Sequence, residues 1–474
     1  MTSSTNIGRG SLAALSSIIG GGLTIFFSSS NVERKESNPK EERGRQFSNS
    51  SSRSLLLHPL QTSFYTNFYK HSQSSLFTNC EIPDHLDPSF PDLSRFGRHS
   101  FVKKYLTHDI YVQLKDKTTS NGVTLEDLIK SGISLPWGAR PVRGCGVYAG
   151  DAESYQTFAP LLLPILEDWH TFRMTPRTKH KGRSRAGAGT AMIRRQVTNL
   201  NPNYILRQNL DPTGEYILQT RMRVARSIQG FAFSPCISRQ KRRELEKLFK
   251  SCVDDWRDDE QLQGAYTRVM DMSNDQHDDL IEKHILFHDP DEYNLSAGIG
   301  RDWPDARGVY MNESDSPEFM IWLNAEDHLR VISMSKGGDL HSVFTRLSKA
   351  LTALETSLKS RGYGFCTDTR LGFLNTSPEN LGTALRASVF VKLVRLGQQP
   401  GFDDLLDRLR LESSTRFKDS NEFRYTGIFD IANAERLGQS EVQLINTMIN
   451  GVGRLIALEK RLEKGERINL DDIK

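Results

Sequence analysis

The sequence predicts an α+β protein: a small all-α N-terminal domain followed by a large domain with an antiparallel β-sheet flanked by helices. Between residues 91 and 177, apolar residues recur at spacings of three and four, as in "ESYQTFAPLLLPILEDWHTF", which is typical of packed helices. Beyond residue 214, short β-rich runs alternate with long amphipathic segments, which indicates a sheet covered by helices. The β-rich runs are "EYILQTRMRV", "EFMIWLNA", "LRVISM", "RLGFLNT", "SVFVKLV" and "TGIFDIA".

The first segment, residues 1–78, is predicted to be a disordered or targeting arm. It is rich in Ser and Asn, and runs such as "NVERKESNPKEERGRQFSNSSSRS" contain too little apolar surface to form a core. Its first thirty residues contain no Asp or Glu and include "SLAALSSIIGGGLTIFF". This stretch fits a transit peptide, the apolar part of a signal or anchor, or an ordinary tail. We therefore expect a mitochondrial or cytoplasmic protein without a stable membrane span.

Three further segments follow in the chain. Residues 79–177 form the helical domain, in which "VTLEDLIKSGI" follows an Asn-Gly turn. Residues 178–210 are predicted to be a basic, Gly-rich linker, because "RTKHKGRSRAGAGTAMIRRQ" lacks any acid. Residues 211–474 form the large sheet domain, with amphipathic helices predicted in "SRQKRRELEKLFKSCVDDW", "LHSVFTRLSKALTALETSLKS" and "SEVQLINTMINGVGRLIALEKRLEKG".

Composition argues against several classes of function. The 62 Lys and Arg nearly balance the 58 Asp and Glu, so the net charge of +4 gives no general attraction to nucleic acid or anionic lipid. The five cysteines are scattered without a C-x-x-C pair, which argues against a disulfide framework or a zinc site. The short motifs for phosphate loops, dinucleotide binding, zinc proteases and serine hydrolases do not occur in a suitable context.

Arginines on strand-like segments are the main chemical signal. Arg221 and Arg223 alternate by two in "LQTRMRVARS", so both project from one face of a strand. Arg330 ends "NAEDHLR", and Arg386 begins the strand after "PENLGTAL". Planar, forked guanidinium groups suit bidentate binding of phosphate oxygens, so four of them together indicate an anion site.

Longer stretches identify the chain as similar to the phosphagen kinases, the ATP:guanidino phosphotransferases such as creatine kinase and arginine kinase. The resemblance covers roughly residues 85–470 and is carried by "GDAESYQTF", "RVARSIQGF", "RDWPDARGVY", "NAEDHLRVISMSKGGDL", "PENLGTALRASV", "GIFDIANAERLGQSEV" and "LEKRLEKGE". It implies an eight-stranded antiparallel sheet, with MgATP on the sheet and a guanidino substrate between the domains. ATP, ADP and a guanidino compound are the implied partners, with Mg²⁺ bound through the nucleotide; a homodimer is allowed for and nucleic acid is not expected.

The resemblance also assigns roles to individual residues. Glu326 matches the carboxylate that orients the substrate guanidinium and takes its proton, and Ser377 occupies a second catalytic position. The nucleotide side comprises the phosphate-binding arginines, a histidine and a residue near the adenine: Arg221, Arg223, His284, Arg330, Arg386, Arg416 and Asp430.

Several positions depart from the family pattern. Ser377 stands where a cysteine thiolate is usual, Ala325 where a first Glu is usual, and Phe390 where a histidine is usual. The loop over residues 412–426 lacks the usual Arg-Gly-Thr, and Arg416 is the nearest substitute. Because a serine hydroxyl does not ionise at neutral pH, the active site is predicted to be divergent. The alternative to an active kinase is a nucleotide-binding pseudoenzyme.

Substrate choice is predicted to depend on "PWGARPVRGCGVYAGDAESY", residues 136–155, within which Cys145 and Tyr148 are candidate substrate-binding residues. The length of this segment resembles that in creatine kinases, whereas the residues "GVYAGDAESYQTF" resemble those of arginine kinases. A longer loop should fill more of the pocket and favour a smaller guanidino compound. Creatine is therefore the first choice, with arginine and taurocyamine as alternatives.

Overall fold

The computed structural model describes residues 100–134, 145–171, 196–312, 317–413 and 427–470, together with a few isolated positions at 87, 89–94, 96, 314 and 473. All of them belong to the unit Glu81–Lys474. The predicted arm, residues 178–195 of the predicted linker, and Arg416 lie outside the described residues. The domain boundaries therefore stay predictions.

A group of helices forms the N-terminal part of this unit, as predicted. They are α2 (Phe101–Tyr105), α3 (His108–Leu114), α4 (Leu125–Ser134), α5 (Ser154–Thr157) and α6 (Ala159–Thr171). The side chains of Ser100 and Thr107 accept hydrogen bonds from backbone N–H groups at the starts of α2 and α3, which caps both helices. Leu114, Leu128 and Phe158 are fully buried between the helices. The apolar spacing of the sequence thus marks one shared core.

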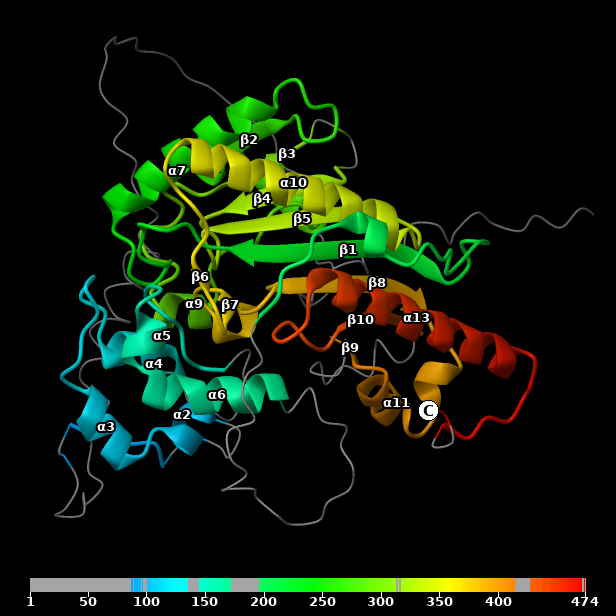
Figure 1. The fold of residues 1–474 in the computed structure, drawn as a ribbon, viewed down its shortest axis with the longest axis horizontal. Coiled ribbons are helices and arrows are strands. Elements are labelled where there is room, and N and C mark those ends of the chain that lie inside the picture. Colours follow the sequence, from blue (N-terminus) through cyan, green and yellow to red (C-terminus); the bar gives the residue numbers. More distant parts are fainter. Residues whose placement is uncertain are drawn as a thin grey trace, which may run out of the picture. The chain divides into compact units, whose positions relative to one another are not determined.

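The large domain is built on one eight-stranded antiparallel sheet in the order β2-β3-β4-β5-β1-β8-β10-β9 (Figure 1). The strands are β1 (Ile217–Arg226), β2 (Ala265–Arg268), β3 (Gly308–Met311), β4 (Phe319–Leu323), β5 (Leu329–Lys336), β8 (Leu385–Lys392), β9 (Leu411–Ser413) and β10 (Ile428–Asn433). The central strand β1 pairs with β5 on one side and β8 on the other. The predicted fold class and the eight-stranded sheet are confirmed.

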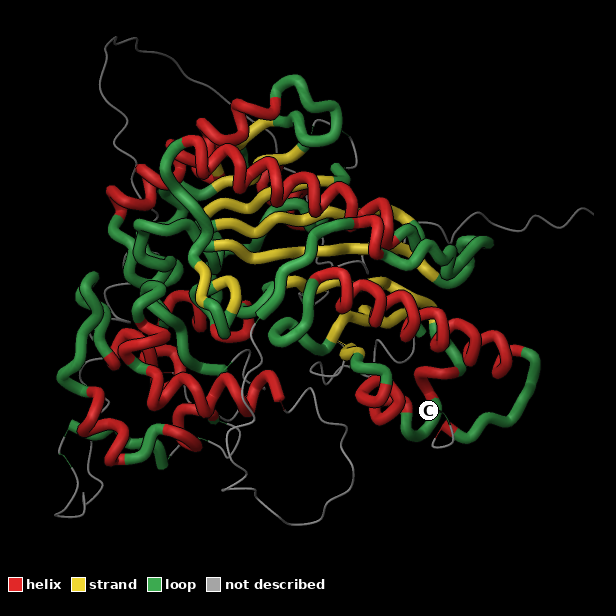
Figure 2. Tube along the Cα trace, in the orientation of Figure 1, coloured by secondary structure: helices red, strands yellow, loops and turns green. Residues whose placement is uncertain are grey.

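Three long helices cover one face of this sheet: α7 (Arg239–Val253), α10 (Leu340–Ser360) and α13 (Glu441–Glu463) (Figures 1 and 2). Met222 and Val224 of β1 point to this face and lie in the main core with Leu347 and Leu351 of α10. The remaining helices are α8 (Asn274–Glu282), α9 (Glu292–Ser296) and α11 (Phe402–Arg408). Single 3₁₀ turns are η1 (Pro202–Tyr204), η2 (Asp254–Trp256), η3 (Val269–Asp271), η4 (Pro378–Asn380) and η5 (Leu396–Gln398).

The opposite face of the sheet carries a smaller apolar cluster at one end. Leu280 and Ile281 of α8 pack there against Trp322, Ile332 and Met334 from strands β4 and β5. Because side chains alternate along a strand, Arg221 and Arg223, which alternate with Met222 and Val224 on β1, point to this second face. Arg221 and Arg223 of β1 therefore lie on the face opposite the three long helices, whereas Arg226 shares the face of Met222 and Val224.

Two features differ from the sequence predictions. The run at residues 370–376 is not one strand: only β7 (Gly372–Phe373) pairs, with the two-residue strand β6 (Thr367–Asp368). Asn375 instead uses its side-chain amide to donate to the Asn380 carbonyl at 2.6 Å, which closes a loop. Residues 196–210 pack on the large domain, since the Asn199 N–H donates to Glu441 Oε2 at 2.8 Å and Leu210 is buried in its core. Among the described residues, no helix is both long and apolar enough to cross a membrane.

Candidate active site

Four arginines meet on the sheet face opposite the long helices. In the pairing of β1 with β8, Arg223 lies directly opposite Arg386. In the pairing of β1 with β5, Arg330 lies opposite Ala225, whose side chain shares the face of Arg221 and Arg223 because the residue numbers differ by two. The strand register therefore brings together four cations that lie up to 165 positions apart in the sequence (386 − 221).

Two of these arginines, Arg221 and Arg223, contact no carboxylate within the part of the chain that the structure describes. Arg221 Nε and Nη2 are buried and have no hydrogen-bond partner among the described residues. The Arg221 guanidinium lies 5.7 Å from the Trp322 ring, and burial followed by repulsion from Arg386 lowers its pKa to about 10. Burial, then Arg386 and Arg330, also lowers the pKa of Arg223. With a pKa of about 10, the Arg221 guanidinium is charged at neutral pH.

Carboxylates hold the other two arginines. Arg386 Nη2 donates to Asp430 Oδ2 at 2.9 Å, and Arg330 Nη2 lies 3.3 Å from Glu326 Oε2 and 3.4 Å from Asp327 Oδ2. Burial lowers the pKa of each guanidinium, but the adjacent carboxylates outweigh it and raise the pKa of both above the ordinary value. Two arginines are thus positioned by protein carboxylates, while Arg221 and Arg223 leave positive charge that an anion with several oxygens can satisfy.

His284 lies close to this arginine cluster. It follows α8 with a positive φ of 58°, and it is half-buried. Burial, then the positive charge of Arg221, lowers the pKa of His284 to about 4. The imidazole is therefore neutral at physiological pH and can accept or donate a hydrogen bond without adding charge.

The loop at residues 375–380 is tied to the turn between β4 and β5 by Asp327. This fully buried carboxylate accepts from the Thr376 N–H at 2.9 Å and from Asn380 Nδ2 at 3.1 Å. Burial, then repulsion from Glu326, raises its pKa to about 6. Because Glu326 precedes Asp327, this link places Glu326 next to the loop that contains Ser377.

The same loop also contacts the N-terminal helical part of the chain. Thr376 accepts the Ala149 N–H at 2.8 Å, and the Tyr155 hydroxyl donates to the Asn375 carbonyl at 2.7 Å. Ser377 is only 2% exposed, and its Oγ accepts the Glu379 N–H at 3.3 Å. The Ser377 loop therefore lies where segment 145–155 meets the sheet domain.

Cys145 and Tyr148 lie beside two carboxylates. The Cys145 N–H donates to Glu379 Oε1 at 3.0 Å. Burial raises the pKa of the Cys145 thiol, and Glu379 and Glu326 raise it further. Burial, then Glu326 and Glu379, also raises the pKa of the half-buried Tyr148. Both side chains are therefore neutral at physiological pH.

The structure thus brings nearly all predicted site residues together: the arginine cluster with His284 and Asp430 on the sheet, and Ser377, Glu326, Cys145 and Tyr148 beside it. Arg416 lies outside the described residues. The sequence interpretation overlooked Asp327, Glu379 and Arg436, whose Nη1 donates to Asn380 Oδ1 at 2.7 Å. The acid in "SPEN", two residues after Ser377, was the available signal for Glu379.

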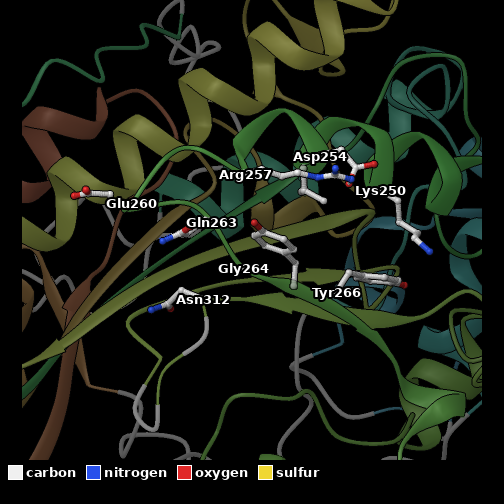
Figure 3. A pocket seen from close by; sticks show the side chains of 10 residues that line it. Lys250, Asp254, Arg257, Glu260, Gln263, Gly264, Tyr266 and Asn312 are labelled. Atoms are coloured by element: carbon white, nitrogen blue, oxygen red, sulfur yellow. The ribbon is translucent and has the colours of Figure 1, made fainter.

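Two other observations concern metals and cavities. Among the described residues, no group of three or more His, Cys, Asp and Glu side chains could hold a metal ion. A cavity of about 520 Å³ lies at the edge of the sheet, between the end of α7 and strands β2 and β3, and is lined by Lys250, Arg257, Tyr266 and Tyr310 (Figure 3). Tyr310 belongs to the core beneath the long helices, so this cavity is separate from the arginine face.

Comparisons with known proteins cover both parts of the chain. The family model for the N-terminal domain of ATP:guanido phosphotransferases matches residues 97–167, and the model for their C-terminal catalytic domain matches residues 244–462. The chain is 41% identical to creatine kinase B-type from Gallus gallus over 387 residues, which is 81% of this chain and 94% of that protein. It is 39% identical to creatine kinase M-type from Oryctolagus cuniculus over 386 residues, 81% of this chain and 94% of the relative.

Two solved structures share the fold. Lombricine kinase superposes with a TM-score of 0.67 at 31% identity, covering 79% of this chain and 97% of the other. The substrate-free duplicated taurocyamine kinase from Schistosoma mansoni also gives 0.67, at 30% identity, covering 78% of this chain and 48% of that longer one.

Proposed function

The chain belongs to the ATP:guanido phosphotransferase family, the phosphagen kinases, and on that premise we propose that it reversibly transfers the γ-phosphate of MgATP to a small guanidino acceptor such as creatine. The observation that carries this proposal is the cluster of four arginines on one sheet face, of which two contact no carboxylate of the described part of the chain.

The arginines supply the electrostatics of the reaction. Arg221 and Arg223 neutralise phosphate oxygens of ATP, and the buried Nε and Nη2 of Arg221 offer unsatisfied donors for them. Arg386 and Arg330 complete the clamp from the two neighbouring strands, oriented by Asp430 and Glu326 respectively. Since phosphoryl transfer depends mainly on alignment and on neutralising the transferred group, a rigid set of cations on strands suits it.

Glu326 acts on the guanidino acceptor. Its carboxylate orients the guanidinium nitrogen toward the γ-phosphorus and accepts the proton that this nitrogen loses as the N–P bond forms and the bond from phosphorus to the β,γ-bridging oxygen breaks. Arg330 contacts the Glu326 carboxylate at 3.3 Å. This ion pair joins the carboxylate that binds the acceptor to one of the arginines that bind phosphate. Cys145 and Tyr148 line the acceptor side.

Mg²⁺ is proposed to enter with the nucleotide. The described residues provide no protein cluster of ligands for it, so the phosphate oxygens and water would hold the ion. When bound, Mg²⁺ neutralises part of the phosphate charge and the arginines neutralise the rest. His284 and Asp430 are proposed to lie on the nucleotide side of the site.

Creatine is proposed as the acceptor because the identity to the creatine kinases, 39–41%, exceeds the 30–31% identity to lombricine and taurocyamine kinases. A coupled assay of ADP release with creatine, arginine, taurocyamine and lombricine tests both the activity and the substrate. Turnover of one compound well above the ATPase background supports the proposal, and background rates with all four would refute it.

A second candidate function is a nucleotide-binding pseudoenzyme. Ser377 and Ala325 favour it, because both replace ionisable groups that the resemblance leads one to expect in this site. MgATP binding in calorimetry without phosphoryl transfer to any guanidino compound would identify this function. The mitochondrial or cytoplasmic location and the oligomeric state stay predictions.

A further inference from the structure

His170 is a buried histidine in the last turn of α6 that the mechanism above does not use. Its Nε2 lies 2.9 Å from the carbonyl oxygen of Pro378, 208 positions later in the chain. A carbonyl oxygen can only accept a hydrogen bond, so Nε2 carries the proton and donates it. His170 therefore joins the N-terminal helical part directly to the Ser377 loop, residues 375–380.

The two ends of the Ser377 loop pack in the same core as α6. Leu374 precedes the loop and Leu381 follows it, and both belong to the apolar cluster of the N-terminal helices. The buried face of α6 in this cluster comprises Leu161, Leu162, Ile165 and Leu166. Because the helix and the loop ends share one close-packed core, the His170 side chain approaches Pro378 from a fixed support.

Each backbone carbonyl from residue 375 to residue 378 accepts a hydrogen bond. The first three accept from the Tyr155 hydroxyl at 2.7 Å, the Ala149 N–H at 2.8 Å and the Asn380 N–H at 2.9 Å, respectively. The carbonyl of the buried Pro378 accepts from His170. A variant without the His170 donor would lose this bond at a buried polar group, which is costly.

The peptide group between Pro378 and Glu379 links His170 to Ser377. A peptide group is planar and trans, so its C=O and its N–H point in opposite directions. Here the C=O accepts from His170, and the N–H donates to Ser377 Oγ at 3.3 Å. Rotation of this peptide plane would disturb both hydrogen bonds together, so the His170 bond also fixes the donor that holds the Ser377 hydroxyl.

We propose that His170 is a positioning residue, which orients the Pro378–Glu379 peptide group and thereby holds the Ser377 hydroxyl on the acceptor side of the site. This inference rests on the proposed function for the role of Ser377. The buried Asp327 carboxylate supports that placement, because it ties the same loop to the turn that contains Glu326.

Two amide replacements separate this hydrogen bond from other roles of His170. The amide nitrogen of glutamine reaches the place of the imidazole Nε2, whereas that of asparagine, on a side chain shorter by one methylene, does not. His170→Gln should therefore keep a donor to Pro378, and His170→Asn should lose it. His108→Asn is the matched control, because His108 of α3 also bonds a backbone group, accepting the Asp87 N–H at 2.7 Å.

The first measurement requires no activity and uses the full chain with Ser377→Cys. Alkylation of the introduced thiol by iodoacetamide is followed by peptide mass mapping, after thermal melting has verified that each variant folds. His170→Asn should raise the alkylation rate about fivefold, because the loop opens more often without this bond. His170→Gln and His108→Asn should match the parent. If His170→Asn does not fold, His170→Phe replaces it, since phenylalanine keeps a ring without a donor.

The second measurement uses the acceptor that turns over in the four-compound assay. His170→Asn should raise the KM for this acceptor about fivefold and leave the KM for MgATP unchanged, and His170→Gln should restore the acceptor KM. In a chain with Ser377→Ala, His170→Asn should have no further effect, because the hydroxyl that it positions is absent.

Equal alkylation rates in all variants, or an undiminished effect of His170→Asn on the acceptor KM in the Ser377→Ala chain, overturn the inference while leaving the kinase function intact. A parent that phosphorylates none of the four compounds refutes the proposed function. The alkylation rates alone then decide whether His170 holds the Ser377 loop.

Discussion

Replacing Arg221 by methionine should stabilise the nucleotide-free protein while weakening MgATP binding. The Arg221 guanidinium is buried among other arginines, and its Nε and Nη2 have no hydrogen-bond partner among the described residues. Such a charge costs free energy until an anion arrives. Methionine keeps the flexible apolar volume of the side chain and removes the charge.

The size of the effect follows from the surroundings of Arg221. Its pKa falls from 12.5 to about 10, which corresponds to roughly 3 kcal/mol against the charged form. Methionine forfeits the contact of the guanidinium with Trp322, worth about 1 kcal/mol. Allowing for imperfect packing, the unfolding free energy should rise by about 1–2 kcal/mol. Loss of a charge-assisted contact should weaken MgATP binding by about 2 kcal/mol, or roughly thirtyfold in Kd.

Arg226→Met is the matched control on the same strand. Burial lowers the pKa of Arg226 to about 10 as well, but its Nη1 donates to the carbonyls of Ala225 and Thr383, and its Nη2 lies 3.9 Å from the buried Glu441. Removing Arg226 leaves the Glu441 carboxylate without this cation. This variant should therefore lose about 3 kcal/mol of stability.

Urea unfolding at pH 7 in the absence of nucleotide measures both stabilities, and calorimetric titration measures the MgATP Kd. The guanidinium of Arg221 is charged in the folded and unfolded chains at this pH, so its cost is fully present. If Arg221→Met is destabilised as much as Arg226→Met and binds MgATP like the parent, Arg221 is a structural residue and the phosphate clamp is misassigned.

The other predictions concern the loop, the buried acid and the arm. Ser377→Cys should give a thiol that iodoacetamide alkylates slowly at pH 8, because the Glu379 carboxylate disfavours the thiolate form. The double variant Ser377→Cys/Glu379→Ser should therefore be alkylated several-fold faster. Equal alkylation rates of the two variants would contradict this prediction. The folded-state pKa of Asp327, about 6 against 3.8, means that its contribution to stability is present below pH 3.8 and is lost as pH rises through 6. Urea unfolding from pH 4 to 7 should therefore show the parent losing stability relative to Asp327→Asn, and the reverse slope would refute the assignment. Deleting residues 1–78 should leave the melting temperature within a few degrees and the activity unchanged, whereas a large drop would show that the arm packs on the core.

The spacing of apolar residues along the sequence was sufficient to predict much of the architecture. The amphipathic run at residues 340–360 forms α10 over the same span, and the β-rich runs at β1, β5 and β8 pair in the centre of the sheet. The predictions for these segments are correct because a long, strongly patterned run has one orientation that buries all its apolar side chains. The edge strands β2 and β9 escaped prediction, since four and three residues are too few to show a period.

The arginine cluster was predictable for a related reason. Arg221 and Arg223 must share a face of any strand, because side chains alternate along the backbone. The positions of Arg330 and Arg386 on the same face depend on the register with β1, which the resemblance to the phosphagen kinases implied and the local pattern did not. Their roles in binding phosphate stay predictions until the variants are measured.

The sequence by itself thus determined the three long helices, the central strands and the shared face of Arg221 and Arg223, because each follows from side-chain spacing along the chain. Only the tertiary structure decided that Asp327 is buried between two loops and that Glu379 meets Cys145, 234 positions away in the chain. Such contacts depend on how separate elements pack, and a loop residue has no periodic pattern from which its neighbours can be inferred. The neighbours of these loop residues therefore emerge from packing, whereas the strand periodicity already indicated that Arg221 and Arg223 share one face.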